Sequence, residues 1–73
     1  RLTYREKEEL AGMESTILDA EAAVETMEAA MNAPGFYEQE HTMVNAALAE
    51  LEAAKKKVQA LYARWEVLES LEK

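Results

Sequence analysis

The chain has 73 residues, enough for one domain, and it combines a formal net charge of −7 with a complete lack of cysteine. Without cysteine there are no disulfides, thiol chemistry or thiolate metal sites, and no apolar stretch approaches the roughly 18 residues of a membrane span. The negative charge argues against strong non-specific attraction to phosphate groups or anionic lipids. Because Arg1 is not a start methionine, we expect the chain to be a piece of a longer protein.

The first predicted helix covers about residues 4–32. Thr3 and Glu6 have the spacing of a capping box, in which the Thr3 hydroxyl accepts a hydrogen bond from the Glu6 backbone and the Glu6 carboxylate accepts one from the Thr3 backbone. Gly12 lies inside this predicted helix, and glycine weakens helix interiors. We therefore expect a kink near residue 12, preceded by a short N-terminal helical segment.

Residues 33–40 are predicted to form a turn. Asn32 and Gly35 suit a left-handed helix cap. Two adjacent aromatic residues, Phe36 and Tyr37, follow, and a solvated loop has no need of such side chains. We expect at least one of them to cover the end of the helix pair.

The second predicted helix covers about residues 41–72, on the order of 45 Å at about 1.5 Å per residue. Ala, Glu, Leu and Lys dominate this stretch, and neither glycine nor proline occurs after Val44, which favours helix strongly. His41, the only histidine, stands at the helix start without further metal ligands. We expect it to be exposed to solvent, and we expect no catalytic, cofactor-binding or metal site in the chain.

Each predicted helix carries one apolar stripe whose members follow one another at alternating steps of three and four, which is typical of a coiled-coil seam. The stripe of the first helix is Leu10, Met13, Ile17, Ala20, Val24, Met27 and Met31, and that of the second is Val44, Ala47, Leu51, Ala54, Val58, Leu61, Trp65 and Leu68. When the chain folds back at the turn, residues at equal distance from it pair, from Met31 with Val44 to Leu10 with Trp65. The sequence therefore predicts an all-α fold, an antiparallel two-helix coiled-coil hairpin with a short N-terminal helical segment.

Charged residues beside the seam agree with this pairing. Glu9 is predicted to face Arg64 and Glu21 to face Lys55, each as an exposed ion pair worth about 0–1 kcal/mol. Such pairs define the register of a hairpin more than its stability.

At the open end of the hairpin we expect Trp65 to be the buried anchor, with Leu2 and Tyr4 packed close to it and to Leu68. Replacing a buried tryptophan by alanine costs about 3–5 kcal/mol, which would unfold a domain of this size. Three further leucines lie at the margins of the seam and leave a homodimer of hairpins open: Leu18, Leu48 and Leu71.

The only basic cluster is the run Lys55, Lys56 and Lys57, with Arg64 beyond it. Two interpretations remain open. As a nucleic-acid site the cluster would contact phosphates, next to the aromatic rings of Tyr62 and Trp65, although Trp65 is a seam position and is expected to be buried. As a solvated helix face it would bind nothing, and the predicted ion pairs of Lys55 and Arg64 favour this second interpretation on physical grounds alone.

Three segments of the chain resemble the C-terminal domain of ABC-F ATPases of the Uup type. The first is the opening stretch 2–10, with its Leu-Thr-Tyr-Arg-Glu start and Glu-Leu end. The second is the turn 32–37, Asn-Ala-Pro-Gly-Phe-Tyr, and the third is the stretch 61–69, which contains Arg-Trp-Glu-Val-Leu-Glu. They occur in the order and at the spacing of that family and together cover nearly the whole chain.

The resemblance implies a cytoplasmic parent protein with two ATP-binding cassettes and no transmembrane domain, which works around the ribosome and translation. ATP and Mg²⁺ would bind only in those cassettes, so this chain would be no enzyme and would hold no cofactor. In this family the appended domain is associated with contact to nucleic acid, either DNA or ribosomal RNA. The candidate contact residues carried over by the resemblance are Lys55, Lys56, Lys57 and Arg64, with Arg1, Arg5 and Lys7 at the base.

A different class of function stays open beside this one. The hairpin would then be a protein-interaction or spacer coiled coil, which meets a protein partner or the parent's cassettes through its acidic face and the tip at Phe36 and Tyr37. Salt distinguishes the two classes, since phosphate binding weakens steeply with ionic strength and an apolar contact does not.

Overall fold

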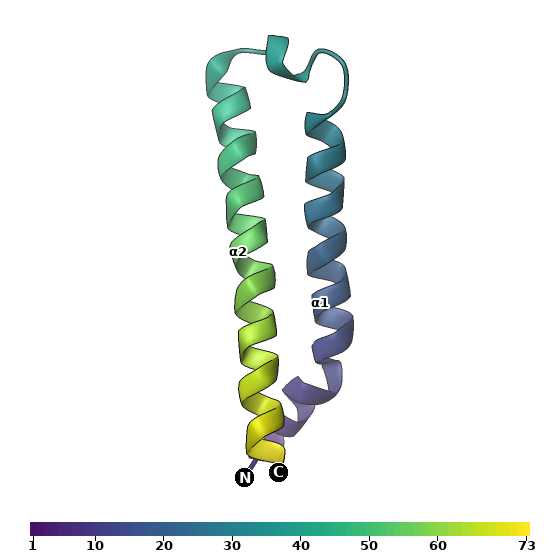
Figure 1. The fold of residues 1–73 in the computed structure, drawn as a ribbon, viewed down its shortest axis with the longest axis vertical. Helices are drawn as coiled ribbons and strands as arrows, with labels where there is room; N and C mark the ends of the chain where they lie inside the picture. Colours follow the sequence, from purple (N-terminus) through teal and green to yellow (C-terminus); the bar gives the residue numbers. More distant parts are fainter.

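The computed structural model describes all 73 residues as two long helices joined by a turn. Helix α1 spans Tyr4–Met31 and α2 spans His41–Glu72, with a short 3-10 helix, η1, at Phe36–Glu38 between them. The helices run antiparallel and side by side, and no strand is present, so the predicted all-α helical hairpin is confirmed (Figure 1).

The molecule is a rod of 52 × 17 × 15 Å. The turn forms one end of the rod, and both chain termini lie together at the other end (Figure 1). Below, the end with the termini is called the base and the end with the turn is called the tip. Neither helix contains a stretch that is long and apolar enough to cross a membrane.

The start of α1 is held by the predicted capping box. The Glu6 backbone donates to the Thr3 hydroxyl at 3.1 Å, and the Thr3 backbone donates to a Glu6 carboxylate oxygen at 2.9 Å. Two of the N–H groups that a helix start leaves without a helical partner are thereby satisfied. The helix consequently begins at Tyr4, directly after its cap.

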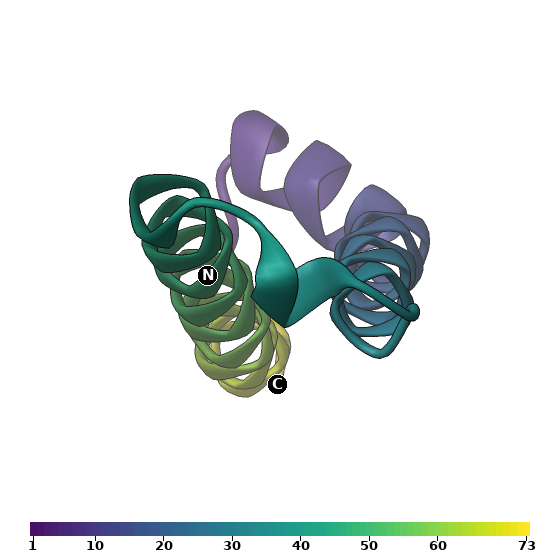
Figure 2. The same cartoon turned by 90° about the horizontal axis from the view of Figure 1, so that it is seen from above.

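The first turns of α1 bend out of line with the rest of the helix and lean across toward α2 (Figures 1 and 2). Gly12 lies eight residues after the first residue of α1, and the Thr16 hydroxyl donates to the Gly12 carbonyl at 3.0 Å. A hydroxyl that bonds to the carbonyl four residues earlier competes with the helical hydrogen bond and bends helices. The expected N-terminal segment is therefore the bent first part of one continuous helix rather than a separate one.

The reversal of the chain is made at Gly35. Asn32 caps α1 in a right-handed conformation, with φ −87° and ψ −5°, so the prediction of a left-handed cap is wrong for this residue. Its backbone still donates to the Glu28 carbonyl at 3.1 Å, which continues the helical pattern by one residue. Gly35, at φ 83°, is the only residue of the chain with a positive φ. This conformation is open to glycine because glycine has no Cβ.

Seven residues are buried, all of them apolar and all members of the two predicted stripes: Met13, Ile17, Ala20, Met31, Val44, Leu51 and Leu68. The tightest packing is at the base. There Met13, Ile17 and Leu68, at most 3% exposed, form one cluster that is flanked by partly buried apolar side chains: Leu2, Leu10, Leu61 and Trp65. The bent start of α1 therefore closes the core at the base.

Two predictions for the base are wrong. Trp65 is only partly buried, and the fully buried anchor is Leu68, one turn further along α2. Tyr4 is 76% exposed, whereas Leu2 packs against the cluster. Leu2 at the chain start packs against the cluster that contains Leu68. The indole of Trp65 lies beside the ring of Tyr62, three residues earlier on α2, with 6.3 Å between centroids.

At the tip the two aromatic residues differ. Phe36 is half-buried, while Tyr37 is 65% exposed, and their rings meet edge to face with centroids 4.8 Å apart. The helix ends beneath them are closed by the buried side chains of Met31 and Val44. Of the two rings, Phe36 is thus the one that covers this end of the hairpin, and Tyr37 faces solvent.

Candidate nucleic-acid interface

The charges of the chain are unevenly distributed along the rod. Residues 19–52, here called the distal half, contain eight acidic residues and no lysine or arginine. Residues 1–18 and 53–73, here called the base half, contain all eight basic residues and the remaining seven acidic ones. The distal half therefore carries a net charge of −8 and the base half of +1.

Arg64 joins the two helices in the base half. Its Nε and Nη2 each donate to the Glu9 carboxylate at 2.9 Å, and Nη2 also lies 3.9 Å from Glu6. The predicted Glu9–Arg64 pair is confirmed. The guanidinium lowers the pKa of Glu9 below its ordinary value of 4.5 by hydrogen bonding, and the same bond raises the pKa of Arg64. A guanidinium held by two carboxylates is poorly available to a phosphate.

Lys55 is paired, but not with the predicted partner. Its Nζ lies 3.7 Å from a Glu28 oxygen, while Glu21 accepts a hydrogen bond from the Tyr62 hydroxyl at 2.8 Å. That bond to a carboxylate raises the pKa of Tyr62. Side chains lean toward the N-terminus of their own helix, and the N-terminus of α2 lies at the tip. Lys55 therefore leans toward the tip and reaches Glu28, which lies one heptad beyond Glu21 on the same side of α1.

The three consecutive lysines do not form one patch. All three are exposed, but Lys55 borders a hollow between the helices that it shares with Glu21, and Lys57 borders another that it shares with Asp19. Lys56 borders neither hollow. Successive residues of a helix point about 100° apart, which separates the three ammonium groups around α2. The run is therefore a dispersed set of charges rather than a single site.

At the base the two chain ends bring further basic residues together. Lys7 borders a hollow with Arg1 and Lys73, together with the carboxylate-bearing Glu72. Arg5 is exposed on α1 and does not line this hollow. Lys73 was missed by sequence reasoning, although the predicted hairpin contained the signal: folding the chain back at the turn places its last residues beside its first.

Six of the eight basic residues have no carboxylate within ion-pair distance, because only Lys55 and Arg64 form ion pairs. The six are Arg1, Arg5, Lys7, Lys56, Lys57 and Lys73. His41 is exposed at the start of α2, and no group of three His, Cys, Asp or Glu side chains is placed to hold a metal ion. The arrangement offers point charges for contact with anions.

The comparisons with known proteins agree on one relationship. The model of the ABC transporter C-terminal domain family matches residues 1–70. The chain is 30% identical over 71 residues to the ATP-binding protein Uup of Escherichia coli K12, a match that covers 97% of this chain and 11% of that protein. It is 29% identical over 69 residues to the ATP-binding protein Uup-like of Haemophilus influenzae, covering 94% of this chain and 15% of the relative. No solved structure gives a significant match.

Proposed function

Because the chain belongs to the family of ABC transporter C-terminal domains, we propose that it is the non-catalytic auxiliary domain of a cytoplasmic ABC-F ATPase. In this proposal the domain contacts nucleic acid, DNA or ribosomal RNA, through its base half. ATP and Mg²⁺ belong to cassettes elsewhere in the parent protein. The names of the two bacterial relatives, both ATP-binding proteins of which this chain spans 11% and 15%, support that division of labour.

The observation that carries the proposal is the position of the basic residues. All eight lie in the base half, and six of them are free of ion pairs. Phosphate groups are attracted to the base half and repelled by the distal half, whose net charge is −8. A nucleic acid would therefore lie along the base half, from the chain ends to Lys56 and Lys57 in the middle of α2, rather than along the distal half.

Dispersed single charges favour weak contact without sequence preference. Phosphates contacted by lysine and arginine contribute affinity and position but carry no sequence information. The two aromatic rings beside this region, Tyr62 and Trp65, are partly engaged with each other, with Glu21 and with the core, so base stacking is a minor contribution. The domain would add to the binding of a larger assembly and would not direct it to one sequence.

Fluorescence anisotropy tests this function with labelled duplex DNA, single-stranded DNA and a structured RNA, each at low and at physiological salt. The decisive variant carries Lys56→Gln and Lys57→Gln, which removes two free ammonium groups. We expect weaker binding to duplex DNA, with a logarithmic salt slope shallower by about 0.9 for each phosphate that the variant no longer neutralises. Lys55→Gln is the matched control, because Glu28 already holds that ammonium and its removal should matter less.

Two results would argue against the nucleic-acid function. One is an absence of binding to all three probes at low salt. The other is binding that is unchanged in the Lys56 and Lys57 variant and in a second variant with Arg5→Gln and Lys7→Gln. In either case the spacer or protein-interaction function, which the acidic distal half favours, would take its place.

A further inference from the structure

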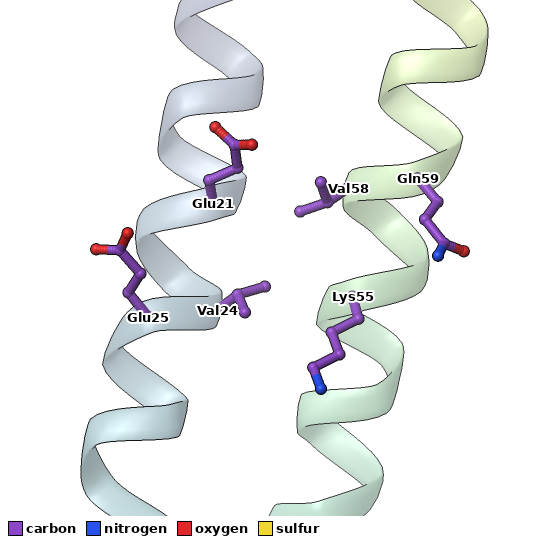
Figure 3. Close-up of a pocket in the computed structure, with 6 residues that line it drawn as sticks. All are labelled: Glu21, Val24, Glu25, Lys55, Val58 and Gln59. Carbon is purple, nitrogen blue, oxygen red and sulfur yellow. The ribbon is translucent and has the colours of Figure 1, made fainter.

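The seam between the helices is incompletely covered in the middle of the rod, most widely on one face. An open hollow of about 480 Å³ lies there, bordered by Glu21, Val24 and Glu25 of α1 and by Lys55, Val58 and Gln59 of α2. The two valines point toward each other across the gap between the helices (Figure 3). Both belong to the apolar stripes but are only half-buried, whereas Ile17 and Leu51 of the same stripes are buried.

Exposed apolar side chains extend this hollow along the rod. Leu18, 61% exposed, lies three residues before Glu21 and therefore on the same face of α1. Leu48 and Tyr62, 38% and 46% exposed, lie one heptad to either side of Lys55 on α2. The hydrogen bond from Tyr62 to Glu21 places the tyrosine on this face independently. The apolar strip from Leu48 to Tyr62 is about 21 Å long at about 1.5 Å per residue.

The α1 rim of this strip is acidic. Glu21, Glu25 and Glu28 follow one another along the α1 side, at steps of four and three. The only basic side chain on the face is Lys55, whose ammonium group is already paired with Glu28. An occupant therefore needs apolar groups for the centre of the strip and positive charge for its α1 edge.

We propose that this strip, formed by Leu18, Val24, Leu48, Val58 and Tyr62, is a docking surface for a basic amphipathic helix of a protein partner. Apolar side chains of that helix would cover Val24 and Val58, and its lysine or arginine residues would face the glutamates of α1. The result is a three-helix bundle of the kind in which an amphipathic helix fills a groove between two others. This site uses another face and another partner than the nucleic-acid contact and does not depend on it.

Charge selects this occupant over the alternatives. A phosphate backbone would meet Glu21 and Glu25, the two rim glutamates without an ion pair, and the negative distal half. A second copy of the chain would bring a further net charge of −7 against the same face. A helix with positive flanks gains from both features, because complementary charge speeds association and disfavours wrong partners.

The probe for the test is a helical peptide of about 21 residues, about 30 Å long, with leucines on one face and lysines beside them. The control peptide carries glutamate in place of each lysine. Amide chemical shifts of the 73-residue chain are followed by NMR during the titration. We expect changes at Val24, Val58 and Tyr62 with the lysine peptide and none with the glutamate peptide. The hollow on the opposite face, which Ala23 and Ala54 border, should stay unchanged.

A pair of charge variants separates this site from general attraction to an acidic rod. Glu25→Lys changes the rim, and Glu50→Lys makes the same change of charge one heptad before Lys57, the residue that borders the opposite hollow. Both glutamates are exposed and lie in the distal half. We expect about tenfold weaker peptide binding for Glu25→Lys, about 1.4 kcal/mol, and less than about twofold for Glu50→Lys.

Three outcomes would overturn the proposal: shifts spread over all the acidic residues of the distal half, equal weakening in the two variants, or an absence of shifts at Val24 and Val58. Sedimentation of the free chain supplies a further check. A dimer whose formation with rising concentration also shifts the Val24 and Val58 amides would show that a second copy occupies the strip instead of a basic helix.

Discussion

Leu68 and Trp65 lie one turn apart on the same stripe of α2, yet their burial differs sharply. Leu68 has no exposed surface, while Trp65 flanks the cluster that Leu68 forms with Met13 and Ile17. Truncating a leucine that is enclosed on every side leaves a cavity, because the neighbours refill the space only partly. The stability of the base therefore depends on Leu68 more than on the larger tryptophan.

Two leucine truncations test this point. Leu68→Ala should lower the free energy of unfolding by about 2–5 kcal/mol, enough to unfold much of a domain this small. Leu18→Ala, the same chemical change at a site that is 61% exposed, should cost less than about 0.5 kcal/mol. Urea unfolding followed by circular dichroism measures both, and equal costs would show that Leu68 is not the anchor.

A second prediction concerns the Glu9–Arg64 pair and pH. Because the pKa of folded Glu9 lies below its ordinary value of 4.5, the pair stabilises the fold fully above about pH 4.5 and this contribution disappears as the pH falls through the lowered pKa. The melting temperature of the parent should therefore exceed that of Glu9→Gln at about pH 7, and the difference should shrink toward about pH 3. A difference that stays constant over this range would contradict the assignment.

Residue-level partners could be predicted from the sequence only in part. The Glu9–Arg64 pair followed from which side of the seam each residue occupies. The same logic placed Lys55 on the correct side of the seam but paired it with Glu21 instead of Glu28. Residue spacing does not describe how far a long side chain leans along the helix. The burial of Leu68 in place of Trp65 depends on packing at the base, which a pattern of apolar residues does not specify.

At the scale of the elements, the two glycines have opposite roles. Gly12 lies inside α1 with a negative φ, and a Cβ there would meet no atom within 4 Å. Gly35 makes the turn at φ 83°, where a side chain is strained even though space is free. The bend at the start of α1 is thus tolerant of a side chain and the turn is not.

Alanine at each glycine should give changes of opposite sign. Gly12→Ala should stabilise the chain by up to about 1 kcal/mol, because alanine is the better helix former. Gly35→Ala should destabilise it by about 1–2 kcal/mol, the cost of a left-handed conformation for a residue with a Cβ. Thermal melts of the two variants beside the parent decide this, and a destabilising Gly12→Ala would mean that the bend requires glycine itself.

Element types and their buried faces were the most predictable level. Every buried residue belongs to a stripe predicted from the steps of three and four, because that spacing alone determines which side of a helix faces its partner. The prediction failed where geometry is set by single hydrogen bonds. Asn32 keeps the helical conformation through its bond to Glu28, so the reversal moves on to Gly35.

At the scale of the whole molecule the rod is long and its core is thin. The radius of gyration is 16.4 Å, compared with about 11 Å for a globular chain of this length. Only seven of 73 residues are buried. The basic residues were visible in the sequence, and the predicted hairpin already implied that all of them lie away from the tip.

The charge distribution predicts how stability responds to salt. Eight carboxylates without a basic residue repel one another in the distal half, and this repulsion is screened as the Debye length falls from about 30 Å at 0.01 M to about 8 Å at 0.15 M. The melting temperature should rise over that range, by about 4–8 °C if screening recovers about 1 kcal/mol. Changing Glu50 and Glu52 to glutamine should flatten the rise. A falling melting temperature would mean that the ion pairs of Lys55 and Arg64 outweigh the repulsion.

Because both termini lie at the base, a rotation of the hairpin about its base moves the tip much farther than it moves the base. Any chain attached to it enters and leaves at the base, so the tip lies 52 Å away with no second attachment of its own. A rotation of about 10° at the base, of the size seen in hinge movements between domains, would carry Tyr37 through about 9 Å. Small changes of angle where the hairpin is anchored would thus become large displacements at its far end.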